Sequence, residues 1–170
     1  GVFMNTPPSV PMPAFRFPLQ SNPNIEFFKL MGCGKSGSFD LRPDWQQYAL
    51  FSVSEHNKVL PLDPDHYENW KKDYYGAFIS KWWSFFGCET TTFVLEPVLS
   101  HGKWSGLDLF PDARKNQLEG PVAVITRATI RASKARDFWK NVAPVQKIMP
   151  NTPGLLFSIG IGEMPVFRQA

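Results

Sequence analysis

The sequence is short of cysteine, of long apolar runs and of net charge. Cys33 and Cys88 are the only cysteines in 170 residues, and neither forms a CxxC pair or a cysteine–histidine cluster. This excludes a disulfide framework and a structural zinc site of the usual spacing. No run reaches the ~18 apolar residues that a membrane-spanning helix needs. The net charge of +3 is too small to indicate a nucleic-acid-binding surface.

What the sequence has in abundance is aromatic side chains. They make up 15% of the chain, with 15 phenylalanines and 6 tryptophans. With 43% hydrophobic residues, the chain is long enough for one domain or for two small halves that share a core. Some of this flat apolar surface is available to a large apolar ligand.

The two ends of the chain do not read like natural ends. Residues 1–4 are apolar like the middle of a segment, and residues 164–169 read like the opening of a strand. We therefore expect the chain to be a portion of a longer protein. Because no basic and apolar leader with a cleavage site is present, we expect a cytoplasmic location.

Secondary structure is predicted from apolar spacing and from the placement of proline and glycine. Apolar residues recur every three or four positions between Asp63 and Gly87, which predicts one long helix. Residues 121–130 alternate cleanly, as a strand does. The prolines of residues 5–24 exclude a long helix there. The other expected elements are a helical turn at 14–17, a helix from Ser133 to Pro150, and strands at 25–31, 48–54, 90–98 and 155–161.

A repeat connects the two halves of the chain. Residues 22–32 (NPNIEFFKLMG) resemble residues 152–162 (TPGLLFSIGIG), at an offset of 130 residues (153 against 23). When the two copies are superposed, the elements around them follow the order β-α-β-β-α-β of the ferredoxin-like unit. The predicted fold class is therefore α+β, with duplicated ferredoxin-like units of the dimeric α+β barrel type. The matching pairs are Pro23 and Pro153, Phe27 and Phe157, and Gly32 and Gly162.

The repeat also predicts domain boundaries. The first unit is expected at residues 1–106, without its opening strand, which is placed before Gly1. Residues 107–120 form a linker loop, and residues 121–170 begin a second unit whose remainder follows Ala170. Two such sheets can meet face to face, and the space between them is a pocket for a flat apolar ligand. The alternative is a core filled by phenylalanine side chains.

Three stretches carry a family resemblance. They are residues 28–34 (FKLMGCG), residues 95–106 (LEPVLSHGKWSG), and residues 120–130 (GPVAVITRATI) followed by Phe138-Trp139 and residues 157–163 (FSIGIGE). In order and spacing they resemble the spheroidene monooxygenase family, the acyclic carotenoid ketolases, over most of residues 20–170. The sequence departs from that family at Arg168, where the resemblance leads us to expect a histidine.

The resemblance implies a monooxygenase that inserts oxygen from O2 into an acyclic carotenoid such as spheroidene. It also implies haem as the cofactor and an external electron donor such as ferredoxin. The sequence does not decide between presence and absence of peripheral membrane contact, or between a monomer and a homo-oligomer. The alternative function is that of a non-catalytic α+β barrel protein, which binds haem or another hydrophobic ligand or serves as an assembly subunit.

A haem iron needs an axial donor, most simply a neutral imidazole. Of the three histidines, His56 follows a strand and His66 lies at the exposed start of a helix, so we expect both in solvent. His101 lies within the second stretch of the resemblance and is the candidate iron ligand; the alternative is an ordinary loop histidine. In other haem-binding α+β barrels the ligand lies on a late helix, which here would follow Ala170. No catalytic residue is assigned.

Two charges interrupt apolar strands, and both are candidates for binding the cofactor. The planar fork of Arg127 suits a haem propionate. One alternative for Arg127 is an internal ion pair, for instance with Glu96. The other is a side chain whose aliphatic part extends along the sheet so that the guanidinium reaches solvent at the sheet edge. Lys29 interrupts residues 27–31 in the same way. Trp104 is expected to line the pocket, with packing in the core as its alternative.

One further motif is rejected. Residues 32–37 (GCGKSG) look superficially like a phosphate-binding loop, but they lack the GxxxxGK[ST] spacing and precede no helix. We expect Cys33 to be a small buried residue rather than a thiolate ligand.

Overall fold

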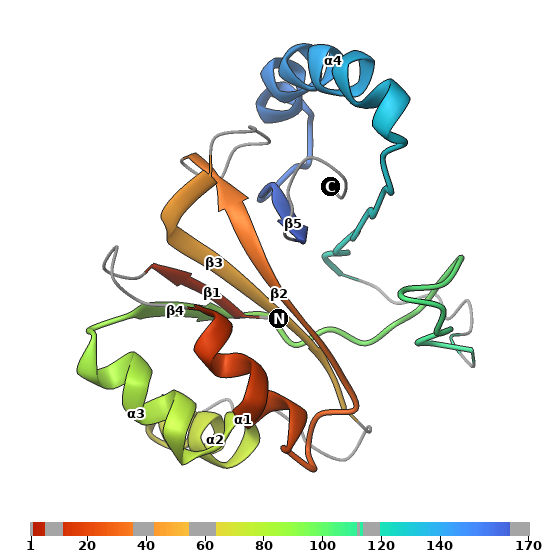
Figure 1. Cartoon of the computed structure of the whole chain (residues 1–170). Coiled ribbons are helices and arrows are strands. Elements are labelled where there is room, and N and C mark those ends of the chain that lie inside the picture. The colour runs from red at the N-terminus through yellow and green to blue at the C-terminus, as the bar shows by residue number, and fades with distance from the viewer. Residues whose placement is uncertain are drawn as a thin grey trace.

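The computed structural model of the chain describes residues 2–5, 12–35, 43–54, 64–111, 113 and 120–163. Its strands are β1 (Val2–Asn5), β2 (Phe27–Gly34), β3 (Pro43–Val53), β4 (Glu89–Thr92) and β5 (Ile161–Glu163). Its helices are α1 (Arg16–Gln20), α2 (Pro64–Tyr75), α3 (Ala77–Phe85) and α4 (Ala135–Ile148), with short 3-10 helices η1 (Met12–Phe15), η3 (Ala132–Lys134) and η4 (Met149–Asn151). The α+β class predicted from the sequence is confirmed (Figure 1).

The five strands form one antiparallel sheet in the order β4-β1-β3-β2-β5. Its longest pairing joins β2 to β3, begins with Phe27 opposite Val53, and shifts register after Gly32. β1 lies between β3 and β4. This strand corrects the expectation that the opening strand of the first unit precedes Gly1. With four residues, β1 is too short for alternation to reveal it in the sequence.

Helices α1, α2 and α3 cover one face of the sheet, and α4 lies at the opposite end of the molecule (Figure 1). Phe28 and Leu30 of β2 and Leu50 of β3 pack into the core that these helices form with the sheet. Because successive residues of a strand point to opposite faces, the side chains between them face away from the helices. The buried core consists of Phe15, Leu19, Ile25, Leu50, Tyr74, Tyr75, Ile79 and Trp83.

The long helix predicted between residues 63 and 87 is two helices. Gly76 separates α2 from α3 with φ of 88° and ψ of 154°, a conformation that is essentially open to glycine alone. The apolar stripe continues across the break, since Tyr75 is 2% exposed and Ile79 is 0% exposed. The spacing therefore identified the buried face correctly, whereas the glycine inside the stripe divides the helix.

The second half of the chain has less regular structure than predicted. Residues 121–130 are all described and form no strand, and of the strand predicted at residues 155–161 only the end is regular, in β5. Val122 and Val124 are 70% and 83% exposed. Alternation distinguishes the two sides of an extended segment, but a strand also needs a neighbour that supplies its hydrogen bonds. The predicted helix is confirmed as α4, and Pro144 lies inside it.

β5 joins the sheet through β2. Met31 lies opposite Glu163, Gly32 opposite Gly162, and Cys33 opposite Ile161. Gly32 and Gly162 are equivalent positions in the repeat seen in the sequence. An antiparallel pair in which equivalent residues face each other is the arrangement that a local twofold axis between two copies produces.

Candidate functional site

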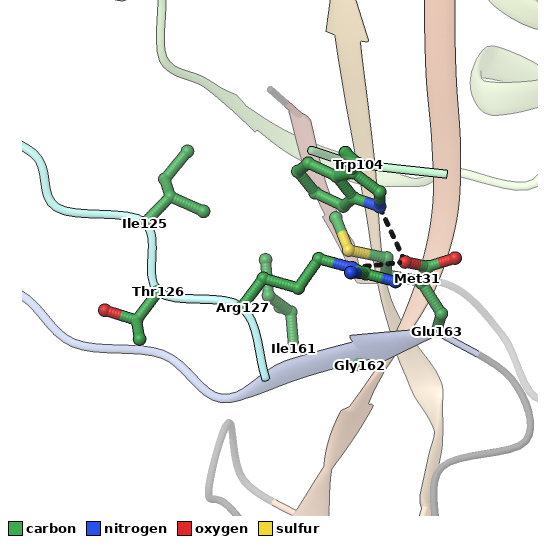
Figure 2. A pocket seen from close by; sticks show the side chains of 8 residues that line it. All are labelled: Met31, Trp104, Ile125, Thr126, Arg127, Ile161, Gly162 and Glu163. Carbon is green, nitrogen blue, oxygen red and sulfur yellow. Dashed lines mark hydrogen bonds and ion pairs between the residues drawn. The ribbon is translucent and has the colours of Figure 1, made fainter. Parts of the chain in front are cut away.

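The face of the sheet that points away from α1, α2 and α3 carries the candidate site. Alternate residues of β2, Lys29 and Met31, point to this face because their neighbours pack into the core. The loop after β4 contributes Trp104, and the segment before α4 contributes Arg127. A small cavity lies beside these residues (Figure 2), and it is lined by Met31, Trp104, Ile125, Thr126, Arg127, Ile161, Gly162 and Glu163.

Glu163, the last residue of β5, is the centre of the polar contacts. The indole N–H of Trp104 donates to its Oε1 at 2.7 Å, and Nε of Arg127 donates to the same oxygen at 3.0 Å (Figure 2). Nζ of Lys29 lies 3.1 Å from Oε2. The Glu163 side chain is 14% exposed, against 22% for Lys29 and 25% for Arg127. One shielded carboxylate thus joins β2, the loop after β4 and the segment before α4, and charge-assisted bonds of this kind are the stronger ones.

The surrounding donors hold Glu163 in its ionised form. Burial by itself raises the pKa of this carboxyl group, but hydrogen bonds from Trp104, Lys29 and Arg127, together with the charge of Lys29, lower it by more. The net result is a pKa below the usual 4.5. At neutral pH the Glu163 cluster, meaning Glu163 with Lys29, Trp104 and Arg127, therefore contains one negative and two positive charges.

A tight turn positions Trp104. Its backbone N–H donates to the carbonyl of Leu107 at 2.8 Å, and the N–H of Leu107 donates back at 3.1 Å. Ser105 and Gly106, between them, have φ of 54° and 82°, as two-residue hairpin turns of the primed type require. Oγ of Ser105 accepts a hydrogen bond from Nζ of Lys29 at 2.7 Å. The turn is therefore tied to the Glu163 cluster at two neighbouring residues.

Trp104 also lies on an aromatic surface of the sheet. Its ring stacks on Phe51, with centroids 4.8 Å apart and planes inclined by 23°, and it meets Phe27 edge-on at 5.7 Å. Phe27 and Phe51 are 6.4 Å apart. We call these three rings the aromatic floor. The guanidinium of Arg127 lies 5.5 Å from the Trp104 ring centroid, within cation–π range, so charge borders the floor directly.

No protein-family model and no solved structure matches the sequence, but curated proteins do. Over 156 residues the chain is 29% identical to the spheroidene monooxygenase of Rhodobacter capsulatus, which covers 91% of this chain and 61% of that protein. It is 29% identical to the spheroidene monooxygenase of Rubrivivax gelatinosus, over 90% of this chain and 56% of that protein. It is 27% identical to that of Cereibacter sphaeroides, over 86% of this chain and 42% of that protein. The chain is similar to the spheroidene monooxygenases over most of its length.

The family resemblance predicted from the three stretches of sequence is thereby confirmed. The chain spans between 42% and 61% of the lengths of these spheroidene monooxygenases. The activity of these whole proteins is therefore only proposed for this chain.

The structure brings together three of the four site residues predicted from the sequence. Lys29, Trp104 and Arg127 meet at Glu163, so the ion pair considered as an alternative for Arg127 exists. Their role in binding a cofactor stays a prediction. His101 lies on the exposed loop before Trp104 and does not line the cavity. Glu163 was missed because one carboxylate at the end of an apolar segment has no spacing signal. Two features could have marked it: it follows the repeated glycine directly, and it ends the third stretch of the family resemblance.

The cavity beside the Glu163 cluster does not have room for the haem that the resemblance implies. The cavity has a volume of about 20 Å³, room for about one water molecule. His66 and His101 are exposed. Burial of Cys33, and to a lesser extent the charge of Asp44, raises the pKa of the Cys33 thiol to about 12, so this thiol is protonated and a poor iron ligand. Outside the described residues lie His56 and Arg168.

Proposed function

We propose that this chain is part of a monooxygenase that inserts one atom of O2 into an acyclic carotenoid such as spheroidene. The observation that carries the proposal is the match to three spheroidene monooxygenases over 86% to 91% of the chain. The second oxygen atom leaves as water, which consumes two electrons and two protons. We propose an external donor such as ferredoxin as the source of the electrons.

The aromatic floor supports a polyene as the substrate. A carotenoid is long, flat and apolar, and a group of aromatic rings such as the floor is complementary to it. In this proposal the substrate lies along the floor, while the contacts from Glu163 and Ser105 keep the Trp104 turn in one orientation. The orientation of the bound chain decides which carbon reacts.

Haem stays a prediction of the resemblance. His101 is its proposed iron ligand, and Lys29, Trp104 and Arg127 are the proposed cofactor-binding residues. The test is the visible spectrum of the full-length protein supplied with haem. We expect a Soret band that shifts with CO and that His101→Ala removes while the matched change His66→Ala leaves it. A colourless protein contradicts the haem proposal, and a band unchanged by His101→Ala contradicts the ligand.

We also propose that the fold is a duplicated ferredoxin-like unit of the dimeric α+β barrel type. Support comes from the order strand, helix, strand, strand, helices, strand between β1 and β4, and from the pairing of Gly32 with Gly162. The units keep their predicted bounds, with the first at residues 1–106 and the second starting at residue 121 after the linker.

None of the described helices combines the length and the apolar character of a membrane span. A cytoplasmic location, a homo-oligomer and peripheral membrane contact stay predictions.

The activity is tested by expressing the full-length protein in a host that accumulates spheroidene. We expect pigments that have gained oxygen, identified by mass and absorption spectrum. Trp104→Ala removes one ring of the aromatic floor and should lower conversion about tenfold or more, because the substrate loses its fixed orientation. Trp45→Ala is the matched control, since Trp45 is 57% exposed and does not line the cavity.

Unchanged pigments in the presence of folded full-length protein contradict the monooxygenase and favour the non-catalytic ligand-binding barrel. Equal conversion by the Trp104 and Trp45 variants contradicts the placement of the substrate on the aromatic floor while leaving the activity in place.

A further inference from the structure

Helix α3 exposes more aromatic surface than the core uses. Its inner side is buried, with Ile79 at 0% and Trp83 at 3% exposure, whereas Phe78 and Phe85 are 50% and 83% exposed. A half-buried Trp82 lies one turn after Phe78 on the same side of the helix. The helix is therefore apolar on both its inner and its outer sides. Packing against the core requires apolar residues on the inner side only.

The two exposed rings are connected through Trp82 and Phe86, which are half-buried and also pack against the core. Phe78 and Trp82 have centroids 5.5 Å apart, Trp82 and Phe86 5.2 Å, and Phe86 and Phe85 5.0 Å. We call these four residues the aromatic ridge. Phe15, at the start of α1, supports the ridge from inside by an edge-on contact with Trp82 at 6.0 Å. Exposed apolar surface that is connected in this way marks a site of interaction.

Within helix α3 and the adjoining helix α1, every charged residue is basic. Lys81 is exposed and is the only charged residue of α3, and the adjoining helix α1 carries Arg16 as its only charge. Beside Arg16, Phe17 adds a further ring that is 76% exposed. Neither helix contains an acidic residue. The surface therefore combines exposed aromatic rings with basic side chains that complement a negatively charged partner.

We propose that the aromatic ridge, flanked by Lys81 and Arg16, docks on the surface of a lipid bilayer that contains anionic headgroups. Aromatic rings enter the boundary between headgroups and acyl chains, while lysine and arginine extend their charges to the phosphate layer. The ridge lies on the helical side of the sheet, away from β5 and α4 (Figure 1). Docking through it therefore leaves the opposite face of the sheet, with Trp104 and Glu163, uncovered by the bilayer.

The test is sedimentation of the 170-residue chain with vesicles of phosphatidylcholine alone or with about 30 mol% phosphatidylglycerol. We expect binding to the anionic vesicles that falls as salt is raised. Phe85→Ser should weaken it about tenfold, as expected for one phenylalanine side chain that no longer leaves water. The matched control is Leu156→Ser, because Leu156 is 82% exposed against 83% for Phe85 but lies outside the ridge.

Equal effects of the two serine variants overturn the proposal, as does equal binding to neutral and anionic vesicles. Because Phe85 is exposed, its variant should keep the thermal transition of the parent chain, which separates lost docking from lost folding. Size-exclusion chromatography without lipid supplies the other decisive readout. A dimer that Phe85→Ser dissociates, with no vesicle binding by the parent chain, assigns the ridge to self-association instead. None of these measurements needs carotenoid or cofactor, so the outcome is independent of the proposed reaction.

Discussion

The indole N–H of Trp104 donates a hydrogen bond of 2.7 Å to Glu163, which lies 59 positions away in the sequence. This contact connects the Trp104 turn to β5, which pairs with β2 in the sheet, whereas no strand pairing joins the turn to β5. The carboxylate is ionised and shielded, so it can hold both cations and the indole at once. The arrangement of the aromatic floor therefore depends on one charged residue.

Glu163→Gln should destabilise the folded chain by about 1–2 kcal/mol. The amide keeps the shape of the side chain but loses its charge, so Lys29 and Arg127 stay partly shielded without their anion. The loss is moderate because both cations retain contact with water. Urea unfolding measures it, with the exposed Glu96→Gln as the matched control. Equal unfolding free energies for the two variants would contradict the central role of Glu163.

The contribution of Glu163 should depend on pH with a definite sign. Its folded pKa lies below the usual 4.5, so the folded state binds a proton less readily than the unfolded chain. The stabilisation is therefore complete above pH 4.5 and is lost as the pH falls through the folded pKa. The measurement is the difference in unfolding free energy between the parent chain and Glu163→Gln from pH 7 downwards. A difference that grows on acidification would have the wrong sign.

Gly76→Ala should destabilise the chain by about 1–3 kcal/mol, because φ of 88° with ψ of 154° is strained for any residue with a Cβ atom. The effect comes from the backbone alone, since an added Cβ meets nothing within 4 Å. Gly32→Ala is the matched control: it also has open space around it and its φ is not positive. Thermal unfolding compares the two, and a loss at Gly32 as large as at Gly76 would argue against the conformational explanation.

Cys33 should resist alkylation in the native chain. Its side chain is 3% exposed, and its thiol has a pKa raised to about 12, mainly by burial, so little thiolate forms at pH 8. Cys88 is only half-buried and should react sooner, although burial also raises its pKa. Iodoacetamide labelling followed by peptide mass spectrometry assigns each site, and both cysteines should react after unfolding in urea. Rapid native labelling of Cys33 would contradict its burial.

Local patterns in the sequence identified much of the secondary structure and part of the site. The three- and four-residue spacing in residues 64–85 depends only on helix geometry, so it identified the buried side of α2 and α3 even though Gly76 divides them. Lys29 and Arg127 could be recognised because a charge inside an apolar segment requires a partner in any fold. The identity of that partner could not be predicted, since Glu163 reaches Lys29 through the pairing of β5 with β2 and meets Arg127 from a separate segment.

The sequence alone determined the α+β class, the helix α4, the strands β2 and β3, and the relation to the spheroidene monooxygenases, because these follow from periodicity and from residues compared one by one. Only the tertiary structure decided that residues 121–130 form no strand, that β1 lies between β3 and β4, and that Trp104 meets Glu163 while His101 stays in solvent. The physical reason is that pairing and ion contacts join segments far apart in the chain. Their free energy depends on which surfaces meet, and local spacing carries no information about that choice.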